Sequence, residues 1–323
     1  MLRRFATLLV LAVLLVPAAH AQESWPTRPV RFIVPSSPGG GTDVFSRLLA
    51  QALSDALKQQ FVVENRPGGS GNVGASIAAK ATPDGYTFLV SANPALSVNP
   101  SLYKNLTYSA ERDFIPVARG VIAPMVLIAH PSLNAKTLAD LIAIGKRDPG
   151  KVAYGSAGTG SPPYLGIRML EEVTGAKFLH VPYKGVGQAY QDLLGGQILF
   201  LLPDAASGLQ HVRAGKVVAL AVDRRIPALP NTPTFDESGV ANFAAQVFTS
   251  FSVVAPAGTP PAIVTRMSAE IMKAFRTPAF AEKLEAQSLV PAFDTPEEFA
   301  ASLKKEREGW AAFIARNGIV AED

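Results

Sequence analysis

Two glycine-rich junctions carry the chemistry that this sequence suggests. In the first, the apolar residues 30–35 lead into Pro-Gly-Gly-Gly-Thr-Asp at 38–43, and a long amphipathic stretch begins at Val44. A strand, a glycine loop and a helix start in this order point backbone N–H groups at whatever lies in front of them, and the helix dipole favours a negative charge there. A second junction, rich in Gly and Ser, follows residues 151–154. Two such loops indicate a protein that holds a small anion between two lobes.

The candidate ligand contacts come first from these loops. In the first loop they are Ser37, Gly39, Gly40, Gly41, Thr42 and Asp43. In the second loop they are Ser156, Ala157, Gly158, Thr159, Gly160 and Ser161. Ser91 and Asn93 follow an expected strand at 86–90, at the carboxyl end where open α/β sheets bind ligands.

Each of these features also has a purely structural interpretation. A glycine-rich turn between a strand and a helix can exist simply to allow a tight turn and close packing. One such loop alone therefore does not show that the protein binds a ligand. Residues 65–71 could approach the cleft or form a plain surface loop. Tyr183, Lys184 and Gly185 precede an expected helix and could stack on a ligand or simply pack.

Enzyme motifs are missing. The sequence Gly-Gly-Ser-Gly-Asn at 68–72 departs from the nucleophile elbow at its last position. The histidines beyond residue 21 are His130, His180 and His211, which lack metal-ligand spacing, and the chain has no cysteine. We therefore expect a protein without catalytic residues, metal or cofactor.

The N-terminus has the pattern of a secretory signal. Arg3 and Arg4 precede an apolar run at 5–16, and Ala19 and Ala21 supply the small residues of a cleavage site. The run is shorter than the roughly 20 residues of a membrane anchor. Cleavage after Ala21 lowers the net charge from +4 to +2, with 28 basic residues against 26 acidic ones. That charge gives no support for nucleic-acid binding. From the cleavable leader we expect an exported, soluble protein.

The remaining residues, 22–323, are enough for two domains of ordinary size. Strands alternate with amphipathic helices, which indicates an α/β protein with largely parallel sheets. Thr42 or Asp43 is expected to cap the helix from Val44, and Thr137 and Thr295 to cap two later helices. Two long extended segments, near residues 121 and 250, bracket the middle α/β set. We expect one domain from 22–123 and 247–323, and a second from the inserted 124–246, with a cleft between them.

An ordered set of motifs then resembles a known family, the Bug periplasmic solute-binding proteins of tripartite tricarboxylate transporters. The motifs are Trp-Pro-Thr-Arg-Pro-Val (25–30), Pro-Gly-Gly-Gly-Thr-Asp (38–43), Val-Glu-Asn-Arg-Pro-Gly (63–68), Pro-Asp-Gly-Tyr-Thr (83–87), Tyr-Gly-Ser-Ala-Gly-Thr-Gly-Ser (154–161), Val-Pro-Tyr-Lys-Gly (181–185) and Ala-Pro-Ala-Gly-Thr-Pro (255–260). The resemblance covers essentially the whole chain after residue 21. It implies a two-lobed periplasmic binding protein fold (type II-like), with two α/β domains joined by two hinge strands.

The resemblance also implies the ligand and its contacts. In that family the two glycine-rich loops hold a small carboxylate through backbone N–H groups, hydroxyls and ordered waters, with no cation in either loop. The segment after Gly195 usually carries Asp in its strand and Phe-Asp at its end, whereas this chain has Leu199, Leu202 and Pro203 there, with Asp204 one residue later. Asp204 and Ser207 are therefore expected near the distal end of the ligand.

These departures favour a carboxylate with an uncharged or aromatic remainder over an amino acid. The expected protein is a periplasmic monomer that binds a small carboxylate and delivers it to an integral-membrane permease. A ligand-sensing partner of a signalling receptor, and a hydrolase that uses the same cleft, are the alternatives.

Overall fold

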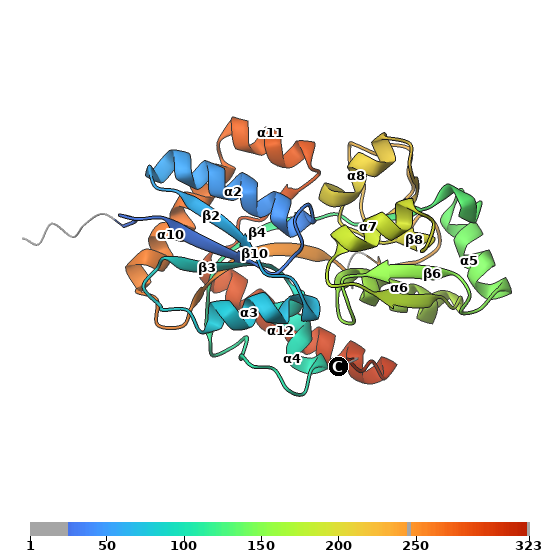
Figure 1. The fold of residues 1–323 in the computed structure, drawn as a ribbon, viewed down its shortest axis with the longest axis horizontal. Helices are drawn as coiled ribbons and strands as arrows, with labels where there is room; N and C mark the ends of the chain where they lie inside the picture. Colours follow the sequence, from blue (N-terminus) through green and yellow to red (C-terminus); the bar gives the residue numbers. More distant parts are fainter. Residues whose placement is uncertain (1–24, 244–246, 322–323) are drawn as a thin grey trace, which may run out of the picture.

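The computed structural model describes residues 25–243 and 247–321. The expected signal peptide, residues 1–21, lies outside the described residues. Two sheets organise the molecule, and we call the parts around them the first and the second lobe (Figure 1). Within the described ranges, no helix combines the length and the apolar character that a membrane span requires.

The first lobe contains a six-stranded sheet in the order β11-β4-β10-β3-β1-β2. Its strands are β1 (Val30–Val34), β2 (Phe61–Asn65), β3 (Thr87–Ala92), β4 (Phe114–Ala123), β10 (Thr249–Pro256) and β11 (Val290–Pro291). The helical elements of this lobe are α2 (Gly41–Leu57), η2 (Gly69–Gly71), α3 (Asn72–Ala79), η3 (Pro94–Val98), α4 (Asn99–Leu102), α10 (Pro261–Phe275), α11 (Pro278–Ala286) and α12 (Pro296–Asn317).

The second lobe contains a five-stranded sheet in the order β7-β6-β8-β5-β9. Its strands are β5 (Val126–Ala129), β6 (Ala153–Ser156), β7 (Leu179–Pro182), β8 (Phe200–Leu201) and β9 (Val218–Val222). Its helical elements are η4 (Pro131–Leu133), α5 (Leu138–Arg147), α6 (Pro162–Thr174), α7 (Val186–Leu194) and α8 (Ala205–Arg213). The two-lobed α/β fold implied by the motifs is thus present.

Both sheets are mixed, which corrects the expectation of largely parallel sheets. Strands β2 and β3 are parallel to β1, but β10 is antiparallel to both β3 and β4. The physical reason is the path of the chain: β4 runs toward the second lobe and β10 returns from it. In the second lobe β6, β7 and β8 are parallel, and β5 is antiparallel to β8 and β9.

The helix signals were largely correct. Thr137 and Asp140 form the capping box of α5, and Thr295 and Glu298 form that of α12. The start of α2 was predicted wrongly. The helix begins at Gly41 after an extended Gly40, and no side chain caps it. Thr42 and Asp43 therefore lie inside the first turn.

Helix α12 packs against both lobes. Its residues Phe299 and Leu303 join an apolar cluster with Ile33 and Leu89 of the first sheet. Farther along, Trp310, Phe313 and Ile314 join the main core of the second lobe. Arg316 near its end also pairs with Glu172 of α6, at 3.5 Å. The C-terminal helix therefore bridges the two lobes.

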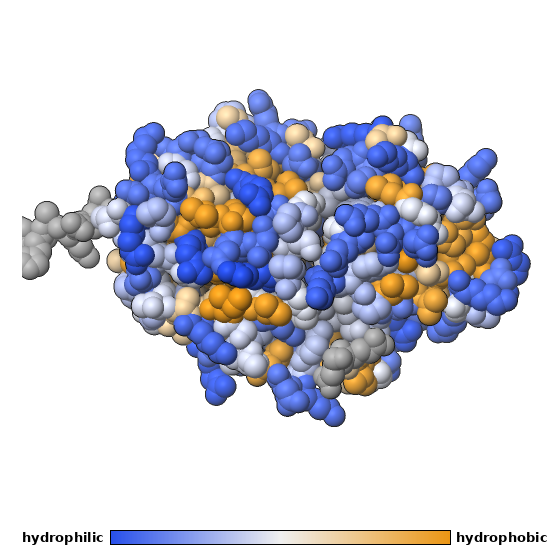
Figure 2. Space-filling view, in the orientation of Figure 1, coloured by the Kyte–Doolittle hydropathy of each residue, from blue (hydrophilic) through white to orange (hydrophobic). Residues whose placement is uncertain are grey.

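The lobes are in contact around the cleft. Ser70 Oγ of the first lobe donates a hydrogen bond to the carbonyl oxygen of Thr159 at 2.8 Å, and Tyr103 donates to the same oxygen at 3.1 Å. Figure 2 shows the lobes touching on the face in view, with an apolar patch over α3, where Val73 and Ile77 are exposed. The structure therefore describes a closed arrangement.

Candidate ligand-binding site

A cavity of about 90 Å³ lies between the lobes, at the carboxyl ends of their parallel strands. Four helices begin at its wall: α2 after β1, α6 after β6, α7 after β7 and α8 after β8. The residues that precede these helices, Gly40, Ser161, Gly185 and Asp204, all line the cavity. Each helix start carries about half a positive charge, so the cavity attracts an anion from both lobes.

Half of the sixteen candidate residues line this cavity. Those that do are Ser37, Gly40, Gly41, Thr42, Ser91, Ala157, Ser161 and Asp204. Those that do not are Gly39, Asp43, Asn93, Ser156, Gly158, Thr159, Gly160 and Ser207. Gly39, Asp43, Ser156, Gly158 and Thr159 form hydrogen bonds that hold the two loops in place.

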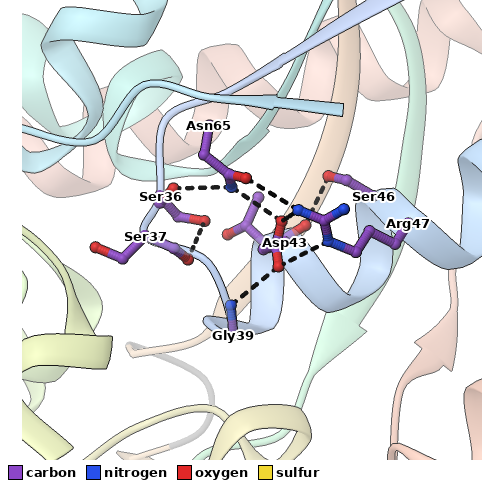
Figure 3. A network of polar contacts seen from close by, with 8 residues as sticks. Ser36, Ser37, Gly39, Asp43, Ser46, Arg47 and Asn65 are labelled. Atoms are coloured by element: carbon purple, nitrogen blue, oxygen red, sulfur yellow. Dashed lines mark hydrogen bonds and ion pairs between the residues drawn. The ribbon is translucent and has the colours of Figure 1, made fainter. Parts of the chain in front are cut away.

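Asp43 turns back onto its own loop (Figure 3). Its carboxylate accepts hydrogen bonds from the Gly39 N–H at 2.9 Å and from the Asn65 amide at 2.9 Å, and it pairs with Arg47 at 3.0 Å. Burial by itself would raise the pKa of Asp43, but these partners outweigh it and hold the pKa below its usual range. Because the Gly40 N–H donates to the Ser37 carbonyl at 3.1 Å, two amides of the glycine loop are used inside the loop.

The second loop is also braced from within. Ser156 Oγ pairs with His180 Nε2 at 2.7 Å and accepts a hydrogen bond from the Gly158 N–H at 3.1 Å. The His180 ring lies between Tyr154 and Tyr164, with ring centroids 5.1 and 4.6 Å away. Burial, reinforced by the positive charge of Arg168, lowers the pKa of His180 to about 4, so its ring is neutral at neutral pH.

Helix α6 presents few N–H donors to the cavity. Its first two residues are Pro162 and Pro163, which have no N–H group. The clamp of backbone amides expected from both lobes is therefore uneven. At this end the polar group is the hydroxyl of Ser161, a residue that is 3% exposed.

The Ser161 hydroxyl is the clearest sign of a ligand. It does not cap α6, and among the described residues it has no hydrogen-bond partner. A buried polar group without a partner costs about 1–3 kcal/mol. Since Ser161 lines the cavity, a bound acceptor would supply the missing hydrogen bond.

Several residues that line the cavity were not among the sixteen candidates. Ser70, Gly71, Lys184 and Gly185 belong to the two segments whose approach to the cleft was left open, whereas Ser36 and Phe251 were not considered. Lys184 is exposed and adds a positive charge at the cavity wall. Its place just before Gly185, the residue that caps α7, was a usable signal. The neighbouring Tyr183 has the packing role that was left open for it, because its hydroxyl donates to Asp192 at 2.6 Å.

Asp204 reaches from the second lobe to the start of α2. Its Oδ1 accepts a hydrogen bond from the Ser207 N–H at 2.9 Å. A β-carbon added to Gly41 would overlap both carboxylate oxygens of Asp204, so the carboxylate lies directly on the helix end. Burial raises the pKa of Asp204, against the opposing hydrogen bonds from Ser207 and Gly41.

A cavity between two α/β lobes, with helix starts that converge on it from both and a hydroxyl without a partner among the described residues, is typical of a periplasmic binding protein. The model of the tripartite tricarboxylate transporter family receptor, built for the family as a whole, matches residues 45–319. The chain therefore belongs to this family of solute receptors.

Individual relatives support this family assignment. BugT of Bordetella pertussis is 36% identical over 306 residues, which cover 94% of this chain and 93% of BugT. The solved periplasmic binding protein BugD is 33% identical, with a TM-score of 0.87 over 92% of this chain and 100% of BugD. Rpa4515 of R. palustris, solved with adipate, is 32% identical, with a TM-score of 0.88 over 92% of this chain and 99% of that protein.

Proposed function

We propose that this protein captures a small organic carboxylate in the cavity between its lobes and delivers it to a membrane permease of the tripartite tricarboxylate type. The observation that carries the proposal is the unpartnered Ser161 hydroxyl in a cavity where four helices begin. The adipate bound by the relative Rpa4515 supports a carboxylate ligand. Lys184 and the cavity hydroxyls would supply the remaining polar contacts.

The free energies of the expected contacts are consistent with moderate affinity. Hydrogen bonds to a charged acceptor contribute roughly 1.5–3 kcal/mol each, and a helix start adds about 0.3–1 kcal/mol. Three or four such bonds approach the roughly 8 kcal/mol of micromolar binding, before ordering and desolvation costs are subtracted. We therefore expect micromolar dissociation constants.

Binding would couple to closure of the lobes. We propose that the lobes comprise 22–123 with 247–323, and 124–246, and that they rotate about the segments that link β4 to β5 and lead into β10. The contacts between Ser70 and Thr159, and between α7 and the loop at Ser37, lie at the cavity rim. An open state would break them, and a ligand would restore them by bridging both lobes.

The location and partners follow from the same proposal. The leader is expected to be removed after Ala21, which would release a monomeric receptor into the periplasm. In the organism that carries it, deletion of the gene should abolish uptake of the ligand. A sensor, in contrast, would leave uptake intact and remove the transcriptional response to the ligand.

A thermal-shift screen of mono-, di- and tricarboxylates, including aromatic acids, tests the proposal. A ligand at a hundred times its dissociation constant stabilises the folded state by about 2.7 kcal/mol, so the melting temperature should rise measurably. Hits should bind in calorimetry and remain chemically unchanged over hours. A screen without any stabilising carboxylate, or turnover of a hit, would contradict the proposal.

A further inference from the structure

One carboxylate of the protein itself occupies the cavity. Asp204 precedes α8 in the second lobe, and its side chain rests on the first residue of α2 in the first lobe. The residue is partly exposed and lines the cavity, so its carboxylate lies close to the ligand space.

The surroundings of Asp204 hold it in this position. Its Oδ1 accepts the Ser207 N–H at 2.9 Å, and Ser207 Oγ donates to its backbone carbonyl at 3.1 Å. Ser207 Oγ in turn accepts a hydrogen bond from the Tyr190 hydroxyl at 3.0 Å. No Lys or Arg forms an ion pair with Asp204 among the residues described. The two helix starts, with Lys184 at the cavity wall, therefore supply the positive potential around it.

Helix α2 therefore already has a carboxyl group at its positive end. The hydrogen bonds from Ser207 and Gly41 and the helix start favour its ionised form against the burial that raises its pKa. The same end is where a carboxylate of the ligand would otherwise lie, following the strand–glycine–helix order. In a cavity of about 90 Å³, a ligand with two carboxylates would place one of them beside Asp204, where like charges repel. A ligand with one carboxylate could direct it toward Ser161, Lys184 and the start of α7 instead.

The rest of the cavity wall suits an uncharged remainder. Apolar side chains come from both lobes and from the returning strand β10, namely Pro35, Ala92, Pro94, Val186 and Phe251. These apolar groups offer no partner to a second charge. The other polar groups of the wall are neutral hydroxyls, those of Ser36, Ser37, Thr42, Ser70, Ser91 and Thr249.

We propose that Asp204 is a specificity-determining residue that restricts this cavity to ligands with a single carboxylate. Its own carboxylate fills the helix end that the second carboxylate of a diacid would need. The inference rests on the proposed function, because it concerns ligand choice in that same cavity.

Matched ligand pairs test this role. Calorimetry compares succinate with monomethyl succinate, and adipate with monomethyl adipate, because each pair differs by one charge and one methyl group. The native protein should bind the monoester at least tenfold more tightly than the diacid in whichever pair fits the cavity. In Asp204→Asn, the diacid should gain at least tenfold relative to the monoester. The ratio within a pair cancels any general effect on closure.

The substitution is chosen to keep the fold. Asparagine is as good a helix cap as aspartate, so its Oδ1 can still accept the Ser207 N–H. Asp204→Ser, another neutral cap, serves if the first variant unfolds, and thermal unfolding checks both. A native protein that binds diacid and monoester equally, or an unchanged ratio in the neutral variants, would overturn the role of Asp204. If no carboxylate of the full thermal-shift screen binds any of these proteins, the proposed function itself is wrong.

Discussion

Ser70 Oγ lies 2.8 Å from the carbonyl oxygen of Thr159, and these two residues belong to different lobes. The Tyr103 hydroxyl reaches the same oxygen at 3.1 Å. One carbonyl of the second lobe thus accepts two hydroxyl donors from the first. Because the contact exists only when the lobes meet, it stabilises the closed state.

Removal of the Ser70 hydroxyl should speed ligand release. A net hydrogen bond contributes about 0.5–1.5 kcal/mol, so Ser70→Ala should weaken binding by about two- to tenfold, mainly through faster dissociation measured by stopped flow. Ser76→Ala is the matched control, because Ser76 pairs with Thr107 inside the first lobe at 2.8 Å. Equal dissociation rates in both variants would argue that the contact between Ser70 and Thr159 does not hold the lobes closed.

Gly41→Ala should block closure while preserving the fold. The added β-carbon overlaps the Asp204 carboxylate only when the lobes are together, and alanine suits a helical position. We expect at least a hundredfold loss of affinity, and no compaction on ligand addition in small-angle scattering. Gly309→Ala in α12, where a β-carbon meets nothing within 4 Å, should bind normally. Normal binding by Gly41→Ala would show that the lobes close differently.

Ser161→Ala separates binding from stability. The unpartnered hydroxyl contributes nothing to the unliganded fold, so the free energy of unfolding should stay equal or rise by about 1 kcal/mol. Affinity should fall by about tenfold or more, since a hydrogen bond to a charged acceptor is lost. Ser288 also has a buried hydroxyl without a partner among the described residues, away from the cavity. Ser288→Ala should therefore leave calorimetric affinity unchanged, and an equal loss in both variants would contradict the assignment.

The buried His180 should make stability depend on pH. Burial, with the positive charge of Arg168, lowers its pKa from 6.5 to about 4. Between these values the unfolded chain binds more protons, so this contribution is complete above pH 6.5 and is lost as the pH falls toward 4. The full loss is about 3 kcal/mol.

Urea unfolding at pH 7 and pH 4.5 measures this effect. Buried carboxyls with raised pKa, such as Asp223 and Glu306, act in the opposite direction. The informative quantity is therefore the difference between the native protein and His180→Gln. The variant should lose less stability on acidification, and parallel pH profiles would refute the role of His180.

Local signals predicted much of the fold. The capping boxes at Thr137 and Thr295 involve residues three positions apart, so the sequence alone contains the interaction. The loop at 38–43 was placed correctly for the same reason. Asp43 was expected to contact the ligand, but its carboxylate accepts a hydrogen bond from the Gly39 N–H. This contact depends on the helix starting at Gly41, which the sequence did not predict.

Contacts between lobes could not be predicted in this way. Asp204 meets Gly41 only because β8 and β1 end at the same cleft, and Ser70 meets Thr159 because two loops project toward each other. The mixed sheets have a similar origin, since strand direction depends on where the chain returns. Pro162 and Pro163 remove two N–H donors from the first turn of α6. This loss matters for binding only because α6 begins at the cavity, which the sequence does not show.

The bridging position of α12 gives the protein a built-in optical reporter. The chain has two tryptophans. Trp25 contacts the rings of Tyr86 and Phe88 at an angle inside the first lobe. Trp310, in contrast, lies where α12 enters the core of the second lobe. Rotation of the lobes would alter the polarity around the Trp310 indole and leave Trp25 undisturbed, so emission from a Trp25→Phe variant should follow opening in real time without a dye.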